Sequence, residues 1–386
     1  MNETIDRLEA RDHGELIAFL DKAFGQPADL PFDKLLPAIY QPDDASMSAN
    51  FAVRKGGNIA AVIGLFPIAW HIGGRRIDAA VVGGVSVAEA FRNQGLMTTM
   101  MRHVVDEISR ERYQVVLLGG QRQRYLHHGW EKAGISLSYD VTSASLRHTA
   151  GSQRLDSVKL IPLTDGSEWT PVLKVMNESR PSWCERSTRS FTLHLRNWGN
   201  SPYVAMDQQE RPVGYAVLGR DKRLVPELAA VTGASAVQII RSLMEIAGTN
   251  CLSIETDILD VRLIRILEQI CESVRPRESG NWRIFDWPDV VETLLLTRLG
   301  TGAMCEGTVV VGLDDRNIAL SISVDSDGPH CEITDTEPDV HGTEAQMIRL
   351  LFGPCKPSAR MTLPSSAAVL DAWCPLPLAL PIQDHG

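Results

Sequence analysis

The sequence predicts a mixed α/β (α+β) protein of several domains, and three observations lead to this prediction. An apolar strand pattern near residue 80 runs into a glycine-bearing turn and a long amphipathic segment. The same order of hairpin, strand, helix and strand returns after residue 200, and the last hundred residues place a helix before a run of strands. A chain of 386 residues is also too long for one domain, so two or three are expected.

The first unit has the clearest periodicity. Its expected elements are a short helix at 16–20, strands at 51–54, 59–65 and 77–87, a helix at 98–110 and a buried strand at 113–118. Gly25 can end the first helix, and glycine turns separate the first three strands. This order brings a strand end, a turn and a helix start together near residue 90.

The turn before the helix at 98–110 is a candidate phosphate cradle. A helix N-terminus carries unpaired N–H groups and partial positive charge, so it can bind a diphosphate without a metal. Gly95 lets the backbone approach closely, and Arg92 adds a cation. Because the turn lacks both the Gly-Lys-Ser/Thr ending of a nucleoside triphosphate loop and the three-glycine dinucleotide fingerprint, it favours coenzyme A.

The pattern Arg92-x-x-Gly95-x-Met97 resembles the R/Q-x-x-G-x-G/A loop of the GNAT acetyltransferases, although Met97 departs from the usual Gly or Ala. The resemblance implies an acyl-CoA N-acyltransferase fold, acetyl-CoA as cosubstrate and no metal. The cofactor-binding residues that it implies are Val85, Ser86, Val87, Arg92, Asn93, Gln94, Gly95, Leu96, Met97, Thr98, Gly120 and Gln121.

A candidate acid follows the next strand. Residues 121–130 resemble the family's Tyr-x-x-x-Gly-aromatic segment, in which a Tyr hydroxyl lies near the cofactor sulfur. Acyl transfer from a thioester expels a thiolate, and a positioned O–H that protonates it contributes typically about 10²–10⁴-fold. Tyr125 is therefore the candidate general acid; the alternative is an aromatic side chain that only packs beneath the helix.

The proton acceptor is less clear from the sequence. His127 and His128 have suitable reference pKa values, but two neighbouring residues in a short helix cannot face the same way. Since the first 183 residues contain no cysteine, direct attack in a ternary complex is expected rather than transfer through a thiol. Backbone N–H groups of residues 85–87 would hold the oxyanion.

A polar segment at 149–153 reads as a linker to a second α/β unit. Its expected elements are a hairpin at 203–206 and 213–218, a strand at 224–231, a helix at 234–247, a strand at 251–254 and a helix at 260–272. The turn at 231–235 has no arginine, so we interpret this unit as a degenerate copy without cofactor.

The last part of the chain resembles a sterol-carrier-protein-like domain. It should hold a helix at 289–298, strands at 307–313, 318–324 and 330–334, and a helix at 344–351. A double GNAT unit followed by such a domain is the layout of the Eis-like acetyltransferases. The expected domains are thus 1–147 (catalytic), 154–285 (degenerate) and 286–386 (carrier-like).

The Eis-like resemblance also implies a role for the chain's end, because in that family the C-terminal carboxylate is thought to enter the first domain's active site as the base. Gly386 is the corresponding residue here, and three prolines with apolar neighbours suit a stiff, docked strand. The ending is not the expected aromatic one, so Asp384, His385 or no tail group remain alternatives.

Composition limits the partners. The net charge of −10 argues against nucleic acid and suits a cationic amine substrate. Without a membrane-length apolar run or a signal-like N-terminus, a cytoplasmic protein that does not bind membranes is expected. Seven dispersed cysteines suit reduced, buried thiols. By resemblance alone, the chain would form a homo-oligomer, either a hexamer or a dimer.

The predicted function is transfer of an acetyl group from acetyl-CoA to a primary amine. The acceptor would be an aminoglycoside- or polyamine-like small molecule, or a peptide lysine. The alternative is a non-catalytic protein that binds lipid or another hydrophobic ligand on a degenerate acyltransferase scaffold.

Overall fold

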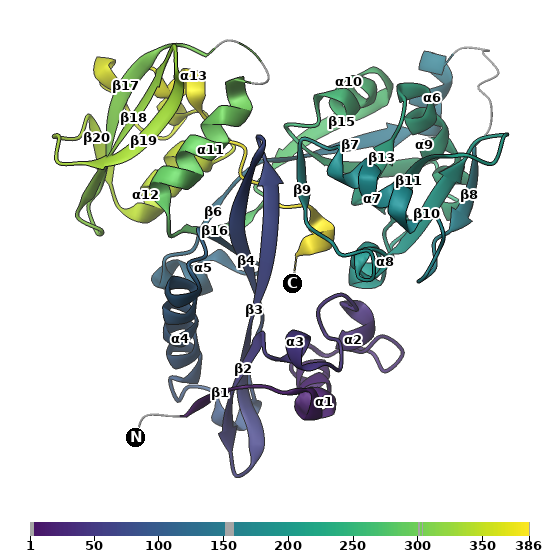
Figure 1. Cartoon of the computed structure of the whole chain (residues 1–386), viewed down its shortest axis with the longest axis horizontal. Coiled ribbons are helices and arrows are strands. Elements are labelled where there is room, and N and C mark those ends of the chain that lie inside the picture. The colour runs from purple at the N-terminus through teal and green to yellow at the C-terminus, as the bar shows by residue number, and fades with distance from the viewer. Residues whose placement is uncertain (1–3, 151–157, 300–301, 303, 386) are drawn as a thin grey trace.

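The computed structural model describes residues 4–150, 158–299, 302 and 304–385. Three units meet near the centre of the molecule, and the C-terminal segment runs between them (Figure 1). The predicted mixed α/β class is confirmed. The expected linker at 149–153 falls at the edge of the described residues and mostly outside them.

The first unit is built on an eight-stranded sheet. In sheet order its strands are β1 Ile5–Arg7, β2 Asn50–Lys55, β3 Asn58–Ile72, β4 Arg75–Val87, β5 Val115–Leu118, β16 Gly280–Ile284 and β6 Glu131–Ala133, with β9 Ser182–Cys184 paired to the far end of β3. All pairs are antiparallel except β4 with β5. Most of the predicted strands are thus confirmed, and β3 is longer than predicted.

Helices cover both faces of this sheet. The helices α1 His13–Phe24, α2 Phe32–Leu35 and α3 Asp44–Met47 belong to one face, where Leu16 and Leu20 pack with Phe66. The helix α4 Leu96–Glu111 covers the other, with Met100 and Val104 in the core. Gly25 ends α1 in the left-handed conformation, as its position predicted.

The second unit has two four-stranded sheets. One has the order β13 Glu227–Ala230, β11 Pro212–Leu218, β10 Ser201–Met206 and β8 Lys159–Pro162; the other is β12 Leu224–Val225, β14 Cys251–Asp257, β7 Ser136–Thr142 and β15 Cys271–Arg277. Its helices are α6 Ser143–Ala150, α7 Thr170–Glu178, α8 Phe191–Arg196, α9 Gly233–Ala247 and α10 Val261–Ile270. The strand predicted over 224–231 divides around Pro226, and α10 ends before residue 271.

Strands cross between the two units. The strand β7 directly follows β6 but pairs with β14 and β15, whereas β16 follows β15 and pairs with β5 and β6. Residues 136–142 therefore join a sheet of the second unit, and residues 280–284 join the sheet of the first unit, the reverse of what chain order predicts. Gly134 lies at the crossing, where a Cβ atom would come within 2.0 Å of both Ser279 Oγ and the carbonyl oxygen of Leu378.

The third unit packs one sheet against helices. Its strands β17 Gly307–Leu313, β18 Ile318–Asp325, β19 Gly328–Thr334 and β20 Val340–Gly342 form the order β19-β18-β17-β20, with helices α11 Trp287–Leu299, α12 Glu344–Phe352 and α13 Leu370–Trp373. The elements match the predicted order. Helix α11 and the sheet share an apolar core that continues into the first unit through Trp282 and Trp70.

The tail is docked, but not as the strand that the prolines suggested. Residues 374–381 are irregular and largely buried, and Ile382–Asp384 forms one 3₁₀ turn. All seven cysteines lie in described residues and none is in a disulfide, although Cys305 and Cys355 are exposed rather than buried. No helix in the described part of the chain is both long and apolar enough to cross a bilayer.

Candidate active site

Strands β4 and β5 separate at the site. Their parallel pairing runs from Ala79 opposite Val115 to Val82 opposite Leu118, and β4 then continues alone to Val87. The edge of residues 83–87 that faces away from β3 has no strand partner among the described residues. Its backbone N–H and C=O groups can therefore bind a ligand that enters between the two strands.

A bulge lies in the same part of β4. Val62 opposes Ser86 and Gly64 opposes Gly83, so two residues of β4, Gly84 and Val85, face the single Ile63 of β3. Gly84 has φ of +62°, a conformation that glycine adopts without strain. The bulge turns the backbone of residues 84–87 at the point where the strands part.

The predicted cradle follows directly. Asn93 and Gly95 both have positive φ, 62° and 78°, and Gly95 immediately precedes α4. Among the described residues no side chain caps this helix, and its first turn holds no acidic residue. The N–H groups of Leu96 and Thr98 thus point out of an uncapped helix start beside the exposed Arg92, which is the geometry for an anion.

The matching turn of the second unit differs in just this respect. The Thr232 side chain caps α9 by accepting a hydrogen bond from Ser235 N–H. A Cβ atom at Gly233 would lie 3.3 Å from the Ile266 side chain, so the backbone of this turn packs closely against α10. One N–H group of this first turn is thus already bonded and is not available to a diphosphate.

Tyr125 lies beside the end of β5. It closes the short helix α5 Arg122–Tyr125, and its side chain is 8% exposed. A Cβ atom built on Gly120 would be 3.2 Å from the Tyr125 ring and 3.8 Å from its hydroxyl, so this glycine leaves space for the ring. Burial raises the pKa of the Tyr125 hydroxyl, which keeps it protonated.

Asn281, which the sequence did not point to, supports this part of the site. It lies on β16 and is 1% exposed; its Nδ2 donates hydrogen bonds of 2.9 Å to the Leu118 carbonyl and 3.1 Å to the Gly120 carbonyl. Because Asn281 lies 163 residues beyond Leu118 in the chain, local sequence gave no signal for this contact. Asn281 fixes the end of β5 where it leaves β4.

We expect Asn281→Leu to destabilise the protein and to weaken binding at the strand split. The substitution leaves the buried Leu118 carbonyl without this donor, which costs about 1–3 kcal/mol, and also removes the hydrogen bond to the carbonyl of the exposed Gly120. Chemical denaturation measures that cost, and calorimetry with CoA measures the binding. An unfolding free energy equal to that of the unmodified protein would contradict this role.

The two histidines lie elsewhere. His127 is exposed and His128 is half-buried; with Arg102, Arg283 and Arg316 they line a cavity of about 420 Å³ between α4 and the third unit. Burial, followed by the charges of its neighbours, lowers the pKa of His128. Tyr125 is not among the described residues that line this cavity, so the geometry gives the histidines no clear part in proton transfer.

A second cavity, of about 290 Å³, lies on the opposite face of the sheet from α4. It is lined by Ala38, Ile39, Ala45, Ser46, Ala49, Phe66, Pro67, Ile68, Cys184, Glu185, His194, Asn197 and Asp384. Phe66 pairs with Val81, one residue before β4 and β5 part, so the cavity adjoins the split. We call it the acceptor cavity.

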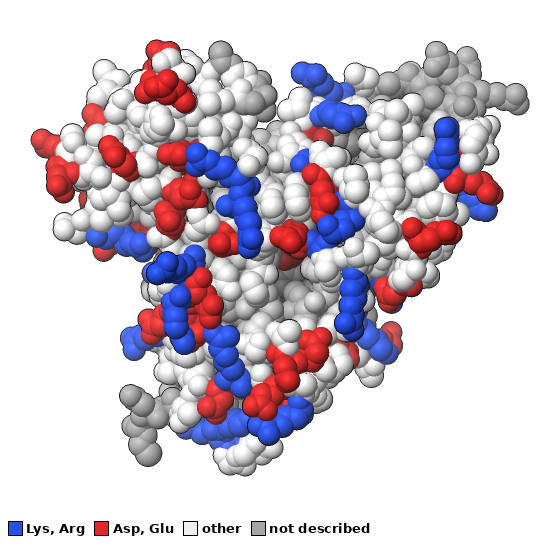
Figure 2. All heavy atoms as spheres, viewed as in Figure 1, with Lys and Arg blue, Asp and Glu red and all other residues white. Residues whose placement is uncertain are grey.

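The molecular surface is hollowed near the same place. In Figure 2 a depression lies at the centre of the face, close to the yellow turn of residues 382–384 in Figure 1, and acidic and basic side chains are interspersed around it. Apolar side chains of β3 and the α2–α3 segment form one wall of the acceptor cavity, and Glu185 with Asp384 forms part of the other.

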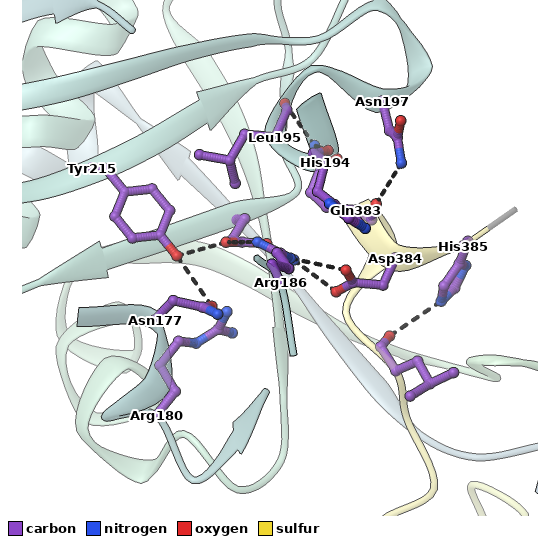
Figure 3. A network of polar contacts seen from close by, with 12 residues as sticks. Asn177, Arg180, Arg186, His194, Leu195, Asn197, Tyr215, Gln383, Asp384 and His385 are labelled. Atoms are coloured by element: carbon purple, nitrogen blue, oxygen red, sulfur yellow. Dashed lines mark hydrogen bonds and ion pairs between the residues drawn. The ribbon is translucent and has the colours of Figure 1, made fainter. Parts of the chain in front are cut away.

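The tail reaches this cavity through Asp384. Gly386, the predicted source of a terminal carboxylate, lies outside the described residues. Asp384 is buried and paired with Arg186, and His385 is turned towards the Leu380 carbonyl, 3.2 Å from its Nε2 (Figure 3). Burial by itself raises the pKa of Asp384, but the Arg186 guanidinium outweighs it and holds the pKa below its usual value.

Comparison with known proteins identifies the first unit. Residues 4–133 match the acetyltransferase (GNAT) domain. No curated protein sequence matches the chain. The match shows an acetyltransferase domain, so this protein is an acyltransferase; GNAT domains use acetyl-CoA.

Solved structures resemble the whole chain. A GCN5-related N-acetyltransferase from Anabaena variabilis has a TM-score of 0.69 at 15% identity, with 98% of both chains covered. A probable N-acyltransferase of unknown function from Enterococcus faecalis scores 0.68 at 12%, covering 99% of this chain and 98% of that one. Eis1 from Mycobacterium abscessus scores 0.66 at 18%, covering 99% and 100%. At these identities the likeness concerns the fold.

Proposed function

We propose that this acyltransferase moves an acetyl group from acetyl-CoA to a primary amine by direct attack in a ternary complex. The acceptor is an aminoglycoside- or polyamine-like small molecule or a peptide lysine. One observation carries the proposal: the uncapped start of α4 with its two positive-φ residues lies directly after the strand split. A thioester carrier with a diphosphate at one end needs both features.

The residues around the split have distinct roles in this proposal. The N–H groups of residues 93–98, with Arg92, bind the diphosphate. The free edge of β4 at Val85, Ser86 and Val87 binds the thioester arm and stabilises the oxyanion of the tetrahedral intermediate. Gly120 and Gln121 border the opposite side of the gap between β4 and β5, just after the end of β5.

Tyr125 is the proposed general acid. When the amine nitrogen bonds to the thioester carbon, the C–S bond breaks and the sulfur leaves as a thiolate. The Tyr125 hydroxyl donates its proton to that sulfur. The proton that the amine nitrogen loses on the way to the amide passes to a base, for which we propose the C-terminal carboxylate of Gly386, carried by a tail whose Asp384 lines the acceptor cavity. Tyr125 regains its proton from solvent.

The wider architecture is also a proposal. Strands also separate in the second unit. There β12 pairs with β14, whereas β13, which follows β12 in the chain, pairs with β11. This, with its capped helix start, supports a tandem, cofactor-free copy. We propose that the third unit is carrier-like and that the protein works as a cytoplasmic homo-oligomer without nucleic-acid or membrane partners.

The direct test is a thiol-release assay with acetyl-CoA and a panel containing spermidine, kanamycin and a lysine peptide. The proposal expects CoA release that depends on the amine, together with acetyl-CoA binding in calorimetry. Binding of a fatty acid without any binding of acetyl-CoA would instead favour a hydrophobic-ligand carrier.

The dependence of the rate on pH follows from the two proton transfers. The amine must lose a proton to react, so kcat/KM for the amine should rise through neutral and mildly alkaline pH. Tyr125 acts in its protonated form, and burial raises its pKa above the ordinary value of about 10. No fall due to Tyr125 is therefore expected below about pH 10. A pH–rate profile with a descending limb near neutrality would contradict this assignment.

A further inference from the structure

A buried ion cluster joins the tail to the second unit (Figure 3). Arg186, in the segment between β9 and α8, is 1% exposed. Its Nε and one terminal nitrogen donate to both oxygens of Asp384 at 2.8 and 2.7 Å, and its terminal nitrogens donate to both oxygens of Glu227 at 2.9 and 2.8 Å. The Tyr215 hydroxyl donates to Glu227 at 2.6 Å. The Arg186 guanidinium thus forms bidentate ion pairs with two carboxylates, those of Asp384 and Glu227.

The neighbouring tail residue is held as firmly. The Gln383 Nε2 donates to the carbonyl groups of His194 and Leu195, at 3.0 and 2.7 Å. The Gln383 carbonyl accepts from Asn197 Nδ2 at 2.9 Å, and its side-chain oxygen accepts from Asn200 at 2.9 Å. The side chains of two consecutive residues, Gln383 and Asp384, are therefore both held by hydrogen bonds to the second unit.

The cluster is also connected to the wall of the acceptor cavity. Asn197, which binds the Gln383 carbonyl, accepts through its Oδ1 a hydrogen bond of 3.2 Å from Ala38 N–H. Ala38 belongs to the α2–α3 segment, and Ala38, Asn197 and Asp384 all line the cavity. Hydrogen bonds therefore run from the tail to the apolar wall on the far side.

Stability alone does not account for this arrangement. Leu376, Leu378 and Leu380 are at most 4% exposed and already anchor the tail through apolar burial. A buried ion cluster is often no more stable than apolar residues of the same volume. What bidentate pairs add is orientation, because an apolar segment can slide by an atom or two and a guanidinium fork cannot.

We propose that Arg186 is a positioning residue for acetyl transfer: by gripping Asp384 it fixes the end of the chain and the 38–49 segment as walls of the acceptor cavity. The inference rests on the proposed function. It predicts that substitution of Arg186 lowers kcat/KM for the amine and leaves the binding of acetyl-CoA unchanged.

The test uses the full-length variants Arg186→Lys and Asp384→Asn, and a chain that ends at Leu380. Arg186→Lys keeps the charge and loses the fork; Asp384→Asn keeps the shape and loses the charge. The control is Glu255→Gln, which removes another buried carboxylate with an arginine partner, Arg277, away from the cavity. The shortened chain leaves the Arg186–Glu227 pair intact and guards against misfolding of the point variants.

Hydrogen exchange is the first measurement, because it needs no acceptor. All three variants should exchange faster at 38–49, and the two full-length ones also at 376–385, while 92–98 exchanges as in the unmodified protein. For the best amine of the panel, kcat/KM should fall at least about tenfold, with KM for acetyl-CoA unchanged. Glu255→Gln should change neither the hydrogen exchange at 38–49 nor kcat/KM for the amine.

The outcomes separate the two proposals. If the variants leave exchange at 38–49 and kcat/KM for the amine unaltered, or only lower the melting temperature, Arg186 is structural and the inference is wrong. If the unmodified protein neither binds acetyl-CoA nor acetylates any amine, the proposed function fails, whatever the variants do.

Discussion

Tyr125→Phe is expected to lower kcat by about 10²-fold or more while KM for acetyl-CoA stays nearly the same, because general acid help is worth about 10²–10⁴-fold. The substitution removes the hydroxyl and leaves the ring packed beside Gly120, so the fold should be unaffected. In the proposed mechanism the unmodified enzyme protonates the leaving thiolate from Tyr125, whose pKa burial raises. The variant must expel the thiolate unprotonated or rely on water.

Tyr113→Phe is the matched control. Tyr113 is a half-buried tyrosine just before β5, and burial raises its pKa as well, but it does not lie at the strand split. Steady-state assays of both variants at several pH values, with melting temperatures, separate chemistry from folding. If Tyr125→Phe retained the full kcat, Tyr125 would be only a packing residue.

Gly95→Asp is expected to raise KM for acetyl-CoA far more than Gly95→Asn does. Both side chains have nearly the same size, and both tolerate the left-handed conformation better than other residues. Gly95 has φ of +78°, and a Cβ atom there would meet no described atom within 4 Å, so neither variant clashes. The two variants therefore differ chiefly by one negative charge at the helix start.

That charge would lie beside the proposed diphosphate. Two like charges about 4 Å apart repel by about 1 kcal/mol in bulk water and by about 4 kcal/mol at the effective dielectric of a protein surface. Since about 1.4 kcal/mol corresponds to a tenfold change, KM should differ between the variants by about 5-fold to several hundredfold at low salt. The difference should shrink as salt is added. Equal KM values would mean that no anion binds at this turn.

Much of the fold could be predicted because its signals are local. Apolar runs separated by glycine turns marked β2, β3 and β4, and apolar side chains at helical spacing marked α4. The cradle was readable for the same reason, since an arginine, a glycine and a helix start lie within seven residues. A local motif needs no knowledge of tertiary contacts.

The strand exchange could not be predicted in this way. No strand was predicted at residues 136–142 or 280–284, and nothing in their pattern tells which sheet they join. The choice depends on pairing across more than a hundred residues, as between β7 and β14 or β16 and β5. Asn281 escaped notice because its role exists only once β16 lies against β5.

The tail was predicted in part. Its prolines and leucines indicated docking, and it is docked. The form was wrong, because the residues make a buried irregular segment with one 3₁₀ turn instead of a strand. Asp384 was named only as an alternative base, and Arg186 was not named; both side chains are committed to each other, which chain order could not reveal.

The most direct test of the account is a crystal structure with CoA bound. The account predicts the diphosphate within hydrogen-bond distance, about 2.7–3.2 Å, of backbone N–H groups at the start of α4, with the sulfur near the Tyr125 hydroxyl. A structure in which CoA binds away from residues 92–98, or in which saturating CoA leaves that turn empty, would contradict it.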